Sequence, residues 1–312
     1  MTANRPRCAV VGAANIDIGG FPSGRIAMRD SNPGRVRLSA GGVGRNIACN
    51  LARLGVETQL VAPLGGDAFA DIVRADCAQA GVGLDLAFAF PGEASSSYLF
   101  IADSAGDMHL AVSDMDICAK LTPAALADRL DALNAMDAVV LDANLSAETL
   151  AFLAENLRAP ILADAVSTAK APRLLAALPR LAALKPNAIE AETLSGVPVR
   201  DADSAARAAR RLVELGAKRC FVTLGERGVC CADKAQALFL PCAPARLVNA
   251  TGAGDAFTAA LAWGELRGLS LRRRAVAGLA AASIAVESLQ TVSPEISAAA
   301  LEERMALIEK LL

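Results

Sequence analysis

The sequence predicts an α/β protein: a three-layer α/β/α sandwich with a mainly parallel central sheet and a small β-sheet lid. From about residue 123 onward, apolar strand-like runs alternate with amphipathic helical stretches. This alternation is typical of a parallel sheet covered by helices on both faces. The apolar run CAVVGAAN at 8–15 ends in small residues, as a central strand does. Further strand-like runs within 16–40 and 84–115 do not fit the sandwich, so we expect these segments to form a projecting lid.

The composition indicates one well-cored domain over residues 1–312. The chain is 54% hydrophobic and 21% charged, and no run approaches the roughly 18 apolar residues of a membrane helix. The first residues, MTANRPRC, lead into an apolar run too short for a secretory signal. The net charge is −2 and there is no basic run, which argues against nucleic-acid partners. We therefore expect a cytoplasmic protein that acts on a small molecule and contacts no membrane.

Cysteine and histidine usage narrows the chemistry. The eight cysteines form no C-x-x-C pair, so we expect small buried hydrophobic residues in a reducing compartment. The single histidine, His109, cannot form an H-E-x-x-H metal site, and a Ser-His-Asp triad would depend on it alone. We place His109 on a strand, as a structural residue or a substrate contact.

In the first half, helical spacing predicts a helix over VGRNIACNLARLG (43–55) that closes on Gly55. TQLVAPLG is strand-like, and DAFADIVRADCAQAG predicts a helix capped by Asp67. Three alternating runs predict strands separated by turns: LDLAFAF, SSYLFIAD and MHLAVSD.

In the second half, strands and helices alternate. Strands are predicted for AVVLDAN, PILADA, LAALKPN and RCFVTLG, followed by an antiparallel pair, GVCCAD and AQALFL. Helices are predicted for PAALADRLDAL, for SAETLAFLAEN, near 172–178, after Asn187, through 203–215, and from Ala256 onward.

The stretch NATGAGDAF (249–257) carries the strongest chemical signal. Its glycines allow a tight turn and leave the amides of Thr251 to Asp255 free at a helix N-terminus, where they can bind an anion. A capped helix after a glycine turn would give the same local pattern. The apolar helix that follows, AFTAALAW, must be buried, which favours a site in an interior cleft.

Other motifs are weaker. GGVGRNIA (41–48) is a second glycine cluster before a helix, but both the G-x-G-x-x-G and the G-x-x-x-x-G-K-[ST] fingerprints are missing. In KPNAIEAE, Asn187 and Glu190 could steer Mg²⁺ through water, or form an N-cap with a first-turn acid. TLGERG (223–228) ends a strand in a glycine turn, and NID (15–17) offers an amide and a carboxylate suited to vicinal hydroxyls.

With these motifs in this order, the chain resembles the PfkB-type carbohydrate and nucleoside kinases, with the ribokinase-like fold, over essentially its whole length. GGVGRNIACNLARLG is similar to the family's first signature and NATGAGDAF to its second. The resemblance implies that Asp255 is the general base and that the amides of Gly252, Ala253 and Gly254 stabilise the transferring phosphoryl group. Because a helix N-terminus favours the ionised carboxylate, we expect a low pKa and a weak base at Asp255.

The resemblance also implies ligand-binding residues. Those for the hydroxyls of the substrate are Asn15, Asp17, Gly41, Gly42 and Asn46. Those for Mg²⁺ and the nucleotide phosphates are Asn187 and Glu190. Those lining the ATP site are Thr223, Gly225, Gly228 and Thr251. The lid would exclude water, and in many relatives lids pair between subunits, so a homodimer is expected.

One residue departs from the family pattern. Most members have an acid where this chain has Asn249, in a region that helps to hold a monovalent cation, so the need for K⁺ is left open. Among family members, VNATGAGDAF, NPGRVRLSAGGVGRNIA, DANLS and AVSDMDI are most similar to the pseudouridine kinases, which phosphorylate a nucleoside 5′-hydroxyl. In that comparison Asp114 and Ser97, opposite each other on lid strands, are candidate substrate neighbours; a turn residue is the alternative for Asp114. Kinases of ribose, adenosine or a hexose, and a non-catalytic ligand sensor, are the competing functions.

Overall fold

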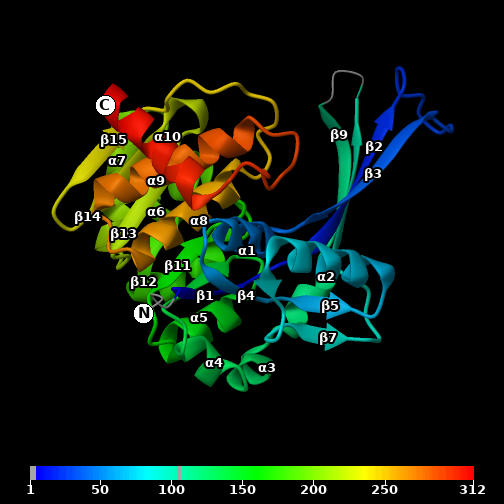
Figure 1. The fold of residues 1–312 in the computed structure, drawn as a ribbon, viewed down its shortest axis with the longest axis horizontal. Helices are drawn as coiled ribbons and strands as arrows, with labels where there is room; N and C mark the ends of the chain where they lie inside the picture. Colours follow the sequence, from blue (N-terminus) through cyan, green and yellow to red (C-terminus); the bar gives the residue numbers. More distant parts are fainter. Residues whose placement is uncertain (1–4, 104–106) are drawn as a thin grey trace.

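The computed structural model describes residues 5–103 and 107–312, and its centre is a nine-stranded sheet (Figure 1). In sheet order the strands are β15 (Ala237–Leu240), β14 (Val229–Asp233), β13 (Arg219–Thr223), β12 (Leu181–Lys185), β11 (Ile161–Asp164), β10 (Ala138–Asp142), β1 (Arg7–Val11), β4 (Glu57–Val61) and β6 (Val82–Gly83). The six pairings from β13 to β6 are parallel, whereas β14 and β15 add an antiparallel edge. The predicted α/β sandwich with a mainly parallel sheet is confirmed.

Helices cover both faces of this sheet because the strand side chains alternate between two separate cores. Val10 packs in one core, while its neighbours Ala9 and Val11 pack in the other. The first core includes α1 (Val43–Arg53), α2 (Ala68–Ala80), α8 (Ala253–Leu266), α9 (Leu271–Val286) and α10 (Ala298–Leu311). The second includes α3 (Pro123–Ala127), α4 (Leu130–Asn134), α5 (Ala147–Asn156), the 3₁₀ helix η2 (Ala171–Arg180), α6 (Ala188–Ser195) and α7 (Ala202–Glu214).

Local signals set most helix ends. Asp67 caps α2 by accepting a hydrogen bond from the amide of Ala70, and Gly55 follows α1 in a left-handed conformation, both as predicted. Two helices differ from expectation. The single helix predicted over PAALADRLDAL is two short helices, α3 and α4. The helix near 172–178 is 3₁₀, and Pro179 lies inside it, where its missing N–H cannot support an α-helical ladder.

A second sheet projects from the body as the predicted lid (Figure 1). It has four strands in the order β3 (Gly34–Gly41), β2 (Asn15–Pro22), β8 (Ser97–Ala102) and β9 (Met108–Asp114). One correction concerns residues 84–96, which lie outside it: β7 (Phe88–Phe90) pairs instead with β5 (Pro63–Gly65). The amide of Phe88 already donates to the carbonyl of Ala62 at the end of β4, which draws this segment to the body.

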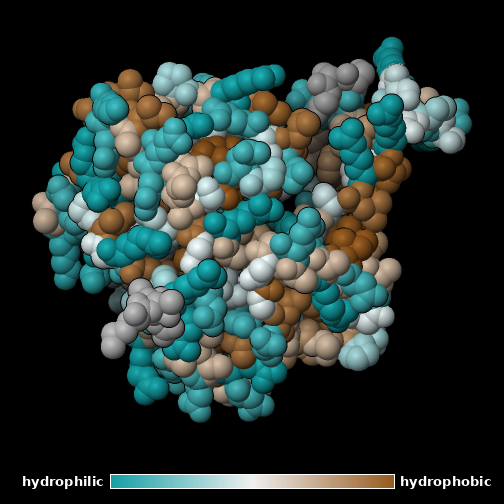
Figure 2. Space-filling model, in the orientation of Figure 1, coloured by the Kyte–Doolittle hydropathy of each residue, from teal (hydrophilic) through white to brown (hydrophobic). Residues whose placement is uncertain are grey.

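The eight cysteines are free thiols, and seven are buried, as expected. Within residues 5–103 and 107–312, no helix is both long and apolar enough to cross a membrane. In Figure 2 hydrophobic residues gather on the surface where the lid joins the body.

Candidate active site

The glycine turn before α8 is built around Gly252. Its φ of 86° is in the left-handed region, and a Cβ there would lie 2.0 Å from the carbonyl oxygen of Thr291. Only glycine fits both constraints, so the turn brings the start of α8 against the 287–292 loop. The amide of Thr251 is not free as expected, because it donates to Oδ1 of Asn249 at 3.0 Å. The cradle for an anion therefore consists of the first-turn amides from Gly252 onward, of which that of Ala253 also donates a long hydrogen bond of 3.4 Å to the carbonyl of Ala250.

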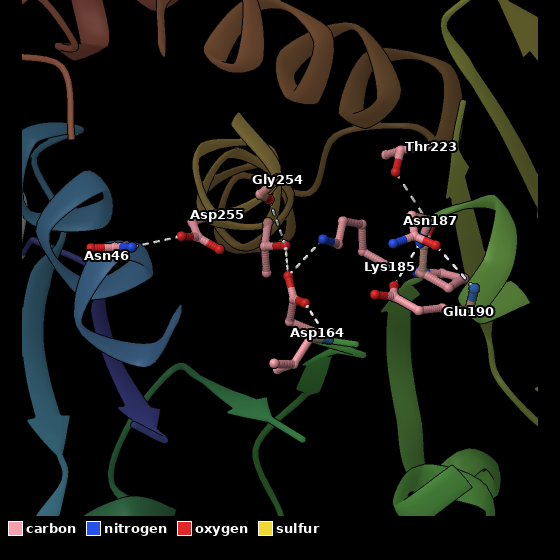
Figure 3. Close-up of polar contacts among 11 residues, drawn as sticks. Asn46, Asp164, Lys185, Asn187, Glu190, Thr223, Gly254 and Asp255 are labelled. Carbon is pink, nitrogen blue, oxygen red and sulfur yellow. Dashed lines mark hydrogen bonds and ion pairs between the residues drawn. The ribbon is translucent and has the colours of Figure 1, made fainter. Parts of the chain in front are cut away.

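Asp255 lies in the first turn of α8 and points toward α1 (Figure 3). The amide nitrogen Nδ2 of Asn46 donates to Oδ2 of Asp255 at 2.8 Å, and within the described residues Oδ1 has no hydrogen-bond partner. Burial and the neighbouring carboxylate of Asp164 raise the pKa of Asp255 to about 7, although Asn46 and Lys185 act in the opposite direction. The expected low pKa is therefore wrong. The enclosed carboxyl loses more from desolvation than it gains from the helix dipole, and a pKa near 7 suits a general base.

Behind the cradle lies a buried ion pair that the motif analysis missed. Nζ of Lys185, at the end of β12, is 2.8 Å from Oδ2 of Asp164, at the end of β11, and both side chains are almost fully buried. The hydroxyl of Thr258 donates to the same oxygen at 2.7 Å. A Cβ on Gly254 would lie 3.2 Å from Nζ of Lys185, so the ammonium is directly beside the helix start. Burial would lower the pKa of Lys185, but Asp164, Glu190 and Asp255 raise it, and the ammonium stays charged.

Asn187 and Glu190 lie on the side of Lys185 away from Asp255 (Figure 3). They form a capping box: the amide of Asn187 donates to Oε2 of Glu190 at 2.8 Å, and the amide of Glu190 donates to Oδ1 of Asn187 at 2.9 Å. Thr223 pairs with Asn187 through a β-bridge, so the two predicted nucleotide-binding segments meet here. Gly225 and Gly228 follow in the turn between β13 and β14, both with positive φ.

The predicted hydroxyl-binding residues also come together. Asn15 pairs with Gly41 where β2 and β3 leave the body, and Nδ2 of Asn15 donates to Oδ1 of Asp17 at 2.7 Å. A Cβ on Gly41 would lie 2.4 Å from Oδ2 of Asp17, so the glycine leaves room for that carboxylate. Burial raises the pKa of Asp17, while Asn15 and Arg45 lower it. Gly42 comes next, with a φ of 96°, and leads into the helix that carries Asn46.

Ser97 and Asp114 pair with each other across β8 and β9, as predicted. However, Ser97 also pairs with Ile16, the residue before Asp17. Successive strand residues point to opposite faces of a sheet, so Ser97 and Asp114 lie on the face opposite Asp17. Their predicted place beside the substrate is not supported by this register. His109 lies exposed on β9, near the free end of the lid.

Asn249 bridges two loops instead of presenting an open cation ligand. Its Nδ2 donates to the carbonyl of Leu289 at 3.3 Å, and its Oδ1 accepts from the amide of Thr251. The backbone amides of Val248 and Asn249 both donate to the carbonyl of Val286, which fixes the same pair of loops. Both polar atoms of this side chain therefore take part in holding the two loops together.

The ends of the parallel strands contain one further missed carboxylate. Asp142 is the last residue of β10 and accepts hydrogen bonds from the amides of Ala13 and Asn144 at 2.8 and 2.9 Å. A Cβ on Gly12 would lie 2.2 Å from Oδ2 of Asp142. The available signal was a charged residue directly after an apolar strand, in AVVLDAN, PILADA and LAALKPN. Chemically, the site combines an anion cradle, a charged ammonium and a carboxyl whose pKa is raised to about 7, a set suited to moving an anionic group onto a hydroxyl.

Comparison with known proteins supports this chemistry. A model of the pfkB family carbohydrate kinases matches residues 5–298. The pseudouridine kinase of Escherichia coli (strain K12) is 34% identical over 292 residues, which cover 93% of each chain. A solved carbohydrate kinase from Agrobacterium tumefaciens has a TM-score of 0.87 at 34% identity and 97% coverage of each chain. Arabidopsis thaliana ribokinase, solved with ribose and ATP, has a TM-score of 0.86 over 97% of this chain and 99% of its own; at 24% identity it supports the fold alone.

Proposed function

The chain belongs to the pfkB family of carbohydrate kinases, and from this premise we propose that it transfers the γ-phosphoryl group of ATP to the 5′-hydroxyl of pseudouridine. The single observation that carries the proposed chemistry is Asp255, with a pKa of about 7, held by Asn46 at the anion cradle. The likeness to a pseudouridine kinase over 93% of the chain supports the choice of acceptor. Kinases of ribose, adenosine or a hexose remain the alternative within the same chemistry.

In the proposed mechanism each group has one task. Asn46 fixes Oδ2 of Asp255, which leaves Oδ1 to accept the proton of the attacking hydroxyl. The amides of Gly252, Ala253 and Gly254 stabilise the charge on the transferring phosphoryl group. Asp17, oriented by Asn15, grips the ribose hydroxyls so that the 5′-oxygen is directed at Asp255.

Lys185 supplies a full positive charge beside the anion cradle, whose backbone amides carry only partial charges. Its ammonium lies beside Gly254 and forms an ion pair with Asp164, while Glu190 and Asp255 are further carboxylates nearby. We assign Lys185 to the phosphate chain of ATP, with Thr258 and Asp164 fixing its position. Thr223, Gly225, Gly228 and the exposed Thr251 line the proposed nucleotide site.

Mg²⁺ would supply charge neutralisation on the ATP phosphates. The described residues contain no cluster of three His, Cys, Asp or Glu side chains that could hold a metal. Oε2 of Glu190 and Oδ1 of Asn187 are already used in the capping box. This donor set fits an ion carried mainly by phosphates and water, which Mg²⁺ prefers, with Glu190 orienting a water. We assign no step to K⁺, because Asn249 joins two loops and carries no charge to hold a cation.

We also propose that the chain is a homodimer that pairs through its lid. Face alternation places a continuous apolar set on the side of the lid opposite Asp17. Its members are Ile18, Val36, Leu38, Leu99, Ile101, Leu110 and Val112, most of them exposed. A second copy of this face would cover them from water. The other face would then close over the acceptor and exclude water from the reaction.

The test is steady-state release of ADP from Mg-ATP with pseudouridine, uridine, ribose, adenosine and fructose as separate acceptors. We expect pseudouridine to give a kcat/KM at least about 100-fold above the others. Asp255→Asn should lower kcat by about 10²- to 10⁴-fold while ATP still binds. A faster reaction with ribose, adenosine or fructose would replace the acceptor but keep the kinase. ATP binding without phosphorylation of any acceptor would instead favour a ligand sensor.

A further inference from the structure

The face of the lid that carries Asp17 also carries aromatic residues. In the register of the sheet, Asp17 on β2 pairs with Tyr98 on β8, and Gly19 pairs with Phe100. Phe21 is two residues beyond Gly19 and therefore lies on the same face. The opposite face contains only aliphatic side chains at the corresponding positions, Ile18, Leu99 and Ile101. The lid thus separates aromatic from aliphatic residues, and the aromatic ones accompany the carboxylate.

The rings of Tyr98, Phe100 and Phe21 pack together into an aromatic ledge above Gly19, which has no side chain. The rings of Phe21 and Phe100 meet edge to face with centroids 5.8 Å apart, and Tyr98 lies 6.2 Å from Phe100. A Cβ on Gly19 would lie 2.7 Å from Phe100 and 2.8 Å from Phe21, so the glycine is required for the rings to lie down on the strand. The hydroxyl of Tyr98 donates to Sδ of Met108 at 3.1 Å, which helps to hold that ring over the sheet.

The ledge is both adjacent to Asp17 and incompletely covered. Paired strands lie about 4.8 Å apart, so the ring of Tyr98 begins one strand spacing from the carboxylate. Tyr98, Phe100 and Phe21 are each half-buried. A ribose gripped by Asp17 would therefore have an aromatic surface beside it, along the strand direction away from the body. Aromatic side chains are the usual stacking surface for nucleobases, because every base offers a π-face.

We propose that Tyr98 and Phe100 form a stacking platform for the heteroaromatic ring of the acceptor, and so select nucleosides over free sugars. This inference rests on the proposed function, since it needs Asp17 at the ribose hydroxyls. Phe21 supports the platform through its edge-to-face contact with Phe100. The platform does not depend on the identity of the base, so it selects for a base as such, and other groups must distinguish one base from another.

Substitution tests the platform through the choice of acceptor. We expect Tyr98→Ala and Phe100→Ala each to lower kcat/KM for pseudouridine by roughly 10- to 100-fold. With ribose as acceptor the same variants should change kcat/KM by less than about three-fold, because ribose has no ring to stack. Tyr98→Phe keeps the ring and should stay within about three-fold of the parent for pseudouridine. Phe90→Ala, which removes a half-buried ring from the stacked pair in β7, should leave both acceptors unchanged.

A parallel loss with ribose and pseudouridine in the Ala variants would mean that the rings only maintain the lid, and would overturn the platform. A binding experiment separates this inference from the proposed function. Tyr98 is the single tyrosine of the chain, so tyrosine-labelled protein gives one set of ring resonances in NMR. Pseudouridine should shift these resonances by ring currents and ribose should not. Unshifted resonances at saturating pseudouridine would refute the platform even if turnover is normal, whereas shifted resonances without turnover would refute the proposed phosphorylation alone.

Discussion

At the scale of single residues, the pKa of Asp255 links stability to activity. Burial raises it to about 7, and the base must be ionised to accept a proton. We expect log(kcat/KM) to rise with a slope of one per pH unit below about pH 7 and to level off above that pH. Initial rates from pH 5 to 9 measure this limb, and a flat profile over that range would contradict the assignment of Asp255 as base.

The same shift predicts a gain in stability on substitution. A carboxyl whose pKa is higher in the folded than in the unfolded state destabilises the fold as pH rises from about 4 through about 7. Asp255→Asn removes that charge, so above pH 7 the free energy of unfolding should increase by on the order of 1–3 kcal/mol, after allowing for partial solvent screening. Urea unfolding at pH 5 and pH 8 measures it, and the gain should be much smaller at pH 5. A loss of stability at pH 8 would count against the raised pKa.

A third prediction at this scale concerns Lys185, which the sequence motifs did not indicate. Lys185→Met leaves Asp164 buried without its partner, which should cost about 3–5 kcal/mol of stability and lower kcat. Lys218→Met, at an exposed position, is the matched control and should change little. Thermal unfolding and ADP release measure the two effects. Normal turnover in Lys185→Met would remove this residue from the mechanism.

Which residues could be predicted depends on how far apart they are in the chain. Asp255, Gly252 and the Asn187–Glu190 box lie in contiguous motifs, and the structure brings them to one edge of the sheet. The hydrogen bond from Thr258 to Asp164 joins residues 94 positions apart in the sequence, so no local pattern indicates it. The low pKa expected for Asp255 was wrong for the same reason, since its burial and the approach of Asp164 and Asp142 arise only in the folded chain.

At the scale of elements, the turn before α8 gives a matched pair of glycines. Gly252 and Gly268 both have positive φ, but a Cβ on Gly252 would lie 2.0 Å from the Thr291 carbonyl, whereas nothing lies within 4 Å at Gly268. Gly268→Ala should cost about 1 kcal/mol of stability and keep full activity. Gly252→Ala should displace the cradle and lower kcat by at least about 100-fold. Equal activity of the two variants would show that the cradle tolerates displacement.

Local patterns predicted the strands and most helices because each is amphipathic or apolar with clear ends, as at Asp67 and Gly55. Local patterns placed β7 in the lid, because its three residues have no feature that distinguishes them from a short lid strand. Its partner, β5, is fixed by where β4 ends, which the sequence does not state. Spacing also predicted that Ser97 and Asp114 pair, but the face that they occupy relative to Asp17 depends on register, which local patterns do not state.

At the scale of the whole molecule, the aliphatic face of the lid predicts the assembly. Leu99 and Val112 pair on this face and are 42% and 58% exposed in the single chain. Leu99→Asp would bury a charge in the proposed interface, so it should turn a dimer into a monomer. Sedimentation velocity measures the mass, with Leu175→Asp, at an exposed position of η2, as the control. A parent chain that sediments as a monomer at micromolar concentration would contradict pairing through the lid.

The measurement that tests the central claim most directly is a competition in one tube. Equal concentrations of pseudouridine, uridine, ribose, adenosine and fructose would share limiting Mg-ATP, and mass spectrometry would count each phosphorylated product. The product ratios equal the ratios of kcat/KM, so they are independent of enzyme concentration and of partial inactivation. We expect pseudouridine phosphate to make up nearly all of the product, and Asp255→Asn to form about 10²- to 10⁴-fold less of it at the same early time point. Another phosphorylated acceptor in excess would contradict the proposed substrate, and equal product from Asp255→Asn would contradict the proposed base.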